Sequence, residues 1–145
     1  MSTPIPNSII IPVTVDDTTD PWNLLVNGNR SSNQTDVGNN SLKQTLEWNL
    51  QLAAGQTGSF NPINETETSG FSWTCTPKPG ANIFSGYSEP STQNGTQIQV
   101  NDLASGASAK GTWTYKLRAT VNGNPCETNP PSARGQEGDP KIHNK

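Results

Sequence analysis

The sequence predicts an all-β domain, arranged as an antiparallel two-sheet sandwich of seven or eight short strands. Polar and apolar side chains alternate in residues 45–53 and again in Gly111–Val121, which gives each segment one buried and one wetted face. Three Asn-Gly dipeptides favour tight turns between strands. Seventeen Asn, seventeen Thr, 13 Gly and 12 Pro favour strands, turns and sheet edges over helices.

Length and composition are consistent with one folded domain. The chain has 145 residues, the usual size of a single domain. Only 29% of the residues are hydrophobic, but the net charge is −3 and there are four Trp, so the composition does not match that of a disordered chain. We expect one domain over residues 1–145, with residues 1–7 and 129–145 loosely ordered.

Weaker strands are expected wherever shorter apolar runs alternate or cluster. In chain order these are residues 9–15, Trp22–Val26, 71–75, 81–87, 97–101 and Lys141–Asn144. Residues 27–40 and 129–139 are rich in turn-forming residues and predict polar loops. Asn122-Gly123 directly follows the strongest strand, so we expect it to fold Cys126 back onto that strand.

One segment resembles a known family of β-sandwich domains. The run Gly111-Thr112-Trp113-Thr114-Tyr115-Lys116-Leu117, which continues to Val121-Asn122-Gly123, is similar to the penultimate strand of bacterial immunoglobulin-like and PKD-like domains. Phe71-Ser72-Trp73 lies about forty residues upstream, where such domains often have a core Trp strand. The resemblance implies an immunoglobulin-like layout of the sandwich and no particular activity.

Charge and hydropathy argue against two classes of partner. The chain has no cluster of Lys and Arg, which argues against nucleic acid. No apolar run approaches the roughly 20 residues of a membrane helix. No signal peptide is visible at the start, so we expect a cytoplasmic protein, or a secreted one if its true N-terminus has been removed.

Catalytic chemistry finds little support among the residues. His143, the sole histidine, lies three residues from the C-terminus, far from the packed surroundings that a catalytic base requires. Cys75 shares the core-facing phase of its strand, and Cys126 follows the Asn122-Gly123 turn. They are candidates for a disulfide, but a reducing compartment, expected without a signal peptide, favours two free thiols.

A few residues are candidates for binding. Asp16, Asp17 and Asp20 supply hard oxygen ligands near a strand end, so calcium is the one possible cofactor. Asp-rich turns also simply end strands by bonding their own backbone. Trp22 and Tyr87 are the aromatic residues left for a surface, because the other Trp residues fall in core phase.

We therefore expect a non-enzymatic binding or structural module that presents polar loops to a protein or carbohydrate surface. The alternative is a small carbohydrate-binding, lectin-like protein, assisted by calcium through the three aspartates. The sequence predicts neither nucleic acid nor membrane as a partner, and it leaves the oligomeric state open.

Overall fold

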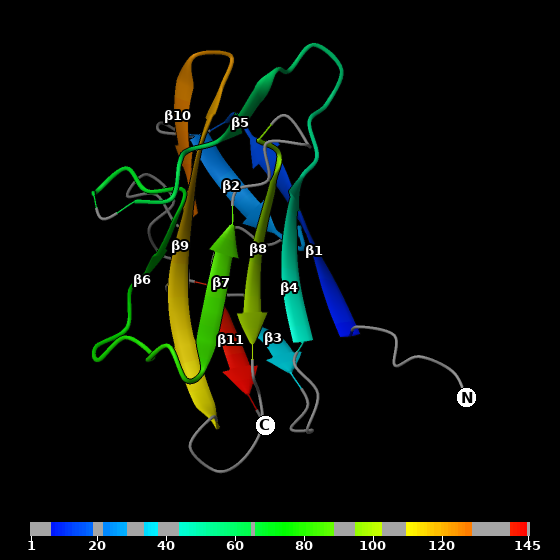
Figure 1. The fold of residues 1–145 in the computed structure, drawn as a ribbon. Helices are drawn as coiled ribbons and strands as arrows, with labels where there is room; N and C mark the ends of the chain where they lie inside the picture. The colour runs from blue at the N-terminus through cyan, green and yellow to red at the C-terminus, as the bar shows by residue number, and fades with distance from the viewer. Residues whose placement is uncertain are drawn as a thin grey trace.

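The computed structural model describes residues 7–18, 22–28, 34–37, 44–64, 66–88, 95–102, 110–128 and 140–144. These residues form strands and turns, and none belongs to a helix long and apolar enough to cross a membrane. The all-β prediction is therefore confirmed for this part of the chain (Figure 1). The strands are β1 (Asn7–Asp16), β2 (Trp22–Val26), β3 (Gln34–Val37), β4 (Gln44–Leu50), β5 (Gly58–Phe60), β6 (Phe71–Trp73), β7 (Phe84–Ser88), β8 (Gln97–Asp102), β9 (Gly111–Val121), β10 (Asn124–Glu127) and β11 (Lys141–Asn144).

Every strand expected from alternation is present, and the differences lie at the ends. β9 matches its expected bounds, whereas β4 ends at Leu50 instead of residue 53. β7 starts at Phe84, because residues 81–83 form a turn. Asn122 and Gly123 both have positive φ, at 51° and 77°, and they join β9 to β10 as expected.

Strand direction departs from the antiparallel prediction. Three pairs are parallel: β1 with β4, β2 with β10, and β3 with β11. The strands also follow one continuous hydrogen-bonded order, β3-β11-β9-β10-β2-β1-β4-β8-β7, with β5 and β6 attached to β9, instead of separating into two antiparallel sheets. The prediction of a purely antiparallel arrangement was therefore wrong. Period-two alternation indicates which face of a strand is buried, but it carries no information on the direction of the neighbouring strand.

The number of strands was also underestimated. β3 lies in the segment expected to be a polar loop, and β5 has three residues without an alternating pattern. In β3, Thr35 and Val37 face inward while Gln34 and Asp36 are exposed. Four residues are too few for this pattern to stand out from the surrounding polar chain.

The core is built around aromatic side chains from strands far apart in sequence. Trp48 of β4 lies 5.2 Å, centroid to centroid, from both Phe71 of β6 and Tyr115 of β9. Its indole Nε1–H donates a hydrogen bond to the Tyr115 hydroxyl at 3.1 Å. The sheet therefore turns back on itself, so that β4 packs over β6 and β9.

Strand β9 organises the remainder of the molecule. Along one edge it pairs with β11 near its start and with β10 near its end. Along the other edge it pairs with β6 and then with β5. Within the described residues β9 is the only strand that pairs with β6, which matters for the site below.

Candidate functional site

A depression of about 780 Å³ lies where β6, β7 and two connecting segments meet. Four aromatic side chains form much of its wall, and polar side chains and one lysine complete it. We call it the aromatic depression. Its lining consists of Ile63, Asn64, Thr66, Phe71, Ser72, Trp73, Lys78, Pro79, Gly80, Ala81, Phe84 and Tyr87.

A bulge in β7 places Tyr87 in this wall. Ser85 pairs with Asn101 and Ser88 pairs with Gln99, so Gly86 and Tyr87 together oppose one residue of β8. Gly86 has a φ of +66°, the conformation that glycine adopts without strain. The extra residue breaks the alternation, and Tyr87 therefore points to the same side as Phe84 instead of the opposite side.

Trp73 and Tyr87 form a pair at the mouth of the depression. The Trp73 indole Nε1–H donates a hydrogen bond to the Tyr87 hydroxyl at 2.8 Å. Trp73 also packs on Phe84, with ring centroids 4.6 Å apart, while Tyr87 keeps 40% of its surface exposed. Partial burial raises the pKa of Tyr87 above its usual value of 10.0, an effect that the hydrogen bond from Trp73 partly offsets.

A close backbone contact at Gly70 brings the polar rim into position. The Gly70 N–H donates to the carbonyl of Pro62 at 3.0 Å. A Cβ atom at Gly70 would lie 2.0 Å from the carbonyl oxygen of Asn61, so only glycine permits this approach. The segment that follows Asn61 is thereby held against β6, and it contributes Ile63, Asn64 and Thr66 to the rim.

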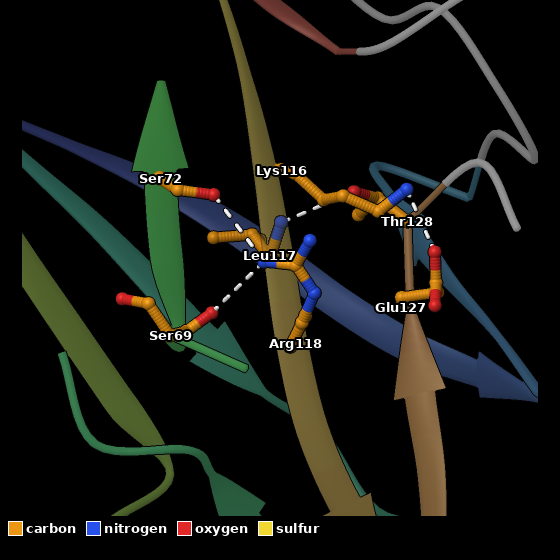
Figure 2. Close-up of polar contacts among 7 residues, drawn as sticks. All are labelled: Ser69, Ser72, Lys116, Leu117, Arg118, Glu127 and Thr128. Carbon is orange, nitrogen blue, oxygen red and sulfur yellow. Dashed lines mark hydrogen bonds and ion pairs between the residues drawn. The ribbon is translucent and has the colours of Figure 1, made fainter. Parts of the chain in front are cut away.

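Positive charge gathers on the outer side of β6 and β9. The Arg118 guanidinium donates to the carbonyl oxygen of Ser69 at 3.4 Å and to the Ser72 hydroxyl at 3.3 Å. On the same strand, Lys116 forms an ion pair with Glu127 of the neighbouring strand β10 at 2.7 Å (Figure 2). The described residues place no carboxylate at ion-pair distance from Arg118, although it adjoins a residue of the depression.

The two predicted ligand-binding aromatics lie in different places. Tyr87 lines the depression, whereas Trp22 packs, partly buried, against the core at β2, level with Cys126 of β10. Trp73 was assigned to the core because it alternates in phase with Phe71. β6 has only three residues, and its last side chain extends to the rim, so Trp73 belongs to both the core boundary and the site.

The predicted calcium ligands are not in the depression. Asp16 Oδ1 accepts hydrogen bonds from the backbone N–H of Thr18, at 3.0 Å, and from its hydroxyl. Asp16 therefore closes the turn at the end of β1, which was the alternative interpretation of this motif. Asp20 lies outside the described residues. Among the residues that the structure describes, no group of three or more Asp, Glu, His or Cys side chains could hold a metal ion. Calcium binding by these aspartates stays a prediction.

Both cysteines are free thiols in the structure. Thr74 N–H bonds to the Thr114 carbonyl, so Cys75 is level with the start of β9, whereas Cys126 pairs with Ala119. These positions are roughly 20 Å apart along β9, and a disulfide requires Cα atoms within about 7 Å. Burial raises the pKa of the Cys126 thiol to about 11, which keeps it protonated and unreactive at neutral pH.

His143 lies in β11, where its Nδ1 is 3.3 Å from the Thr112 hydroxyl. It is not among the residues that line the depression.

No protein-family model matches this sequence, and a search of curated proteins finds no significant relative.

Proposed function

We propose that this protein is a non-enzymatic binding module that receives its partner in the aromatic depression. The observation that carries the proposal is the partly exposed Trp73–Tyr87 pair, held between core aromatics and a polar rim. Binding sites in proteins are typically concave and largely apolar, with a few polar groups that orient the ligand. As part of the same proposal, the fold is a β-sandwich of immunoglobulin-like outline, supported by the packing of β4 over β6 and β9.

Binding fits the side chains of the lining better than catalysis does. The lining residues that titrate are Lys78 and Tyr87. A tyrosine hydroxyl is protonated at neutral pH, and burial raises the pKa of Tyr87 further, so this group serves as a hydrogen-bonding group. The indole and phenol rings offer rigid contact area with a polar tip, as expected of residues that dominate binding energy.

Replacement of Tyr87 by alanine tests this function. The full chain is screened against a glycan array and a displayed library of random twelve-residue peptides. We expect Tyr87→Ala to weaken any selected ligand by about tenfold or more, the effect of losing a central aromatic contact. Ile10→Ala is the matched control, because Ile10 is also a large exposed apolar residue, at 53%, and does not line the depression. Ligands that tolerate Tyr87→Ala as well as Ile10→Ala contradict the proposal.

A lectin-like function is the second candidate, favoured by the exposed Tyr87 side chain beside the partly exposed Trp73. Sugar rings stack on such aromatic faces, and Asn64 could supply hydrogen bonds from the rim. Neither Asp16 nor Asp17 lines the depression, so a calcium ion held there would act on stability instead of touching the sugar. Glycan binding measured with and without a chelator tests this alternative. Equal binding in both conditions removes the role of calcium, and an empty array removes the lectin.

A further inference from the structure

The aromatic depression lies at an edge of β6 and not on one of its faces. Three consecutive residues of β6, Phe71, Ser72 and Trp73, line it. Successive side chains of a strand point to opposite faces, so Ser72 points away from the side that Phe71 and Trp73 occupy. A cavity over one face would touch only alternate residues. Contact with all three places the depression beside the backbone of the strand.

This edge carries unused hydrogen-bonding groups. Thr74 N–H bonds to the Thr114 carbonyl at 2.9 Å, and Arg118 N–H bonds to the Gly70 carbonyl at 3.1 Å. Backbone groups alternate between the two edges of an antiparallel strand, so Phe71 and Trp73 direct theirs away from β9. The Ser69 hydroxyl donates to the Phe71 carbonyl at 2.7 Å. Within the described part of the chain, the N–H groups of Phe71 and Trp73 and the carbonyl of Trp73 have no partner.

The charged side chains beside this edge indicate which sign of charge a partner should carry. Lys78 is the charged residue of the lining. Arg118 contacts Ser72 and Ser69 through neutral oxygens only, while the neighbouring Lys116 is neutralised by Glu127 (Figure 2). An anionic side chain on the partner would therefore find one cation in the lining, Lys78, and a second, Arg118, beside Ser72 of β6.

We propose that the ligand of the aromatic depression is an extended, acidic peptide segment that adds as a strand to the open edge of β6. This inference rests on the proposed binding function and names its partner class. The N–H and carbonyl of Trp73 can pair with the carbonyl and N–H of one residue of an antiparallel peptide strand. Alternate side chains of that peptide would then pack against the aromatic wall. A sugar lacks this repeating arrangement of donors and acceptors.

The test uses peptides selected from the displayed random library against the full chain. We expect acidic residues to be enriched and binding to weaken with added salt. A single N-methyl group should cut affinity by about tenfold at one position of a selected peptide, the residue opposite Trp73, because the Trp73 carbonyl is the free acceptor at this edge. In hydrogen exchange, the amide of Trp73, which is only partly buried, should become protected on binding. Lys78→Gln should weaken an acidic peptide several-fold, and Lys141→Gln, at β11, serves as its charge-matched control.

Four outcomes overturn the inference. N-methylation without effect at every position, or an unprotected Trp73 amide in a saturated complex, removes the strand-addition geometry. If no peptide is selected but a glycan binds in a way that depends on Tyr87, the peptide inference fails and the proposed binding function stands. If neither panel yields a ligand that depends on Tyr87, both proposals fail together.

Discussion

Two Trp-to-Tyr hydrogen bonds of the same chemistry lie in different surroundings, which makes their energies separately measurable. Trp48 donates to Tyr115 at 3.1 Å with both side chains at 0% exposure. Trp73 donates to Tyr87 at 2.8 Å at the mouth of the depression. Tyr115→Phe and Tyr87→Phe remove the acceptor oxygen in each pair and leave the ring in place.

The two substitutions should differ in stability. After Tyr115→Phe the indole N–H of Trp48 stays buried without an acceptor, which costs about 1–3 kcal/mol. The stack of residue 115 on Phe71, with centroids 5.4 Å apart and planes at 11°, is retained. In a domain of this size the thermal midpoint should fall by roughly 3–10 °C. After Tyr87→Phe, water can replace the lost acceptor, so we expect a change below about 0.5 kcal/mol.

Urea unfolding followed by far-UV circular dichroism measures both changes against the wild type. Equal losses for the two variants would refute the assignment of Trp48 and Tyr115 to a dry core. A loss below about 0.5 kcal/mol for Tyr115→Phe would refute it as well. A stable Tyr87→Phe variant would also be a suitable protein for testing the role of the Tyr87 hydroxyl in binding.

Other expectations concern alkaline pH, the thiols and the bulge. Burial raises the pKa of Tyr115 and of Cys126, so the folded state holds these protons more tightly than the unfolded state does. The free energy of unfolding should therefore fall as pH rises above about 9. Urea titrations at several pH values should show a smaller fall for Tyr115→Phe than for the wild type. Iodoacetamide followed by mass spectrometry should modify Cys75 first, and Cys126, 2% exposed, only on unfolding. Gly86→Ala should destabilise by about 1–2 kcal/mol in urea, since φ is +66° and the new Cβ would lie 2.3 Å from Asn101 Nδ2.

The sequence predicts well those strands in which apolar side chains occupy one face and polar side chains the other. β9 is the clearest, because Tyr115, Leu117, Ala119 and Val121 are fully buried between polar neighbours. The direction of pairing was not predictable in the same way. The parallel match of Ile9 with Leu46, for example, depends on contacts across nearly forty positions of chain. Hydrophobic alternation looks the same for either direction.

The candidate site was only partly predictable, for reasons that are local. Tyr87 was identified as a surface aromatic, but its inward turn depends on the bulge at Gly86, which shows itself in the sequence only as a glycine between Phe84 and Tyr87. Gly70 offered a similar signal just before β6. A glycine inside an apolar strand pattern predicts a bulge or a close backbone approach, and this rule could have drawn attention to Gly86, which lies within β7.

The construction of the site also bears on how strongly it could bind. Phe71 and Trp73 are successive core-side residues of β6, and Phe71 lies against both Trp48 and Tyr115. The wall of the depression is therefore a continuation of the core, with side chains already fixed by packing on their inner sides. Binding costs free energy for every rotamer that must be ordered. Since the aromatic wall is ordered before a ligand arrives, little of that cost should fall on this protein, and an extended peptide would contribute most of it.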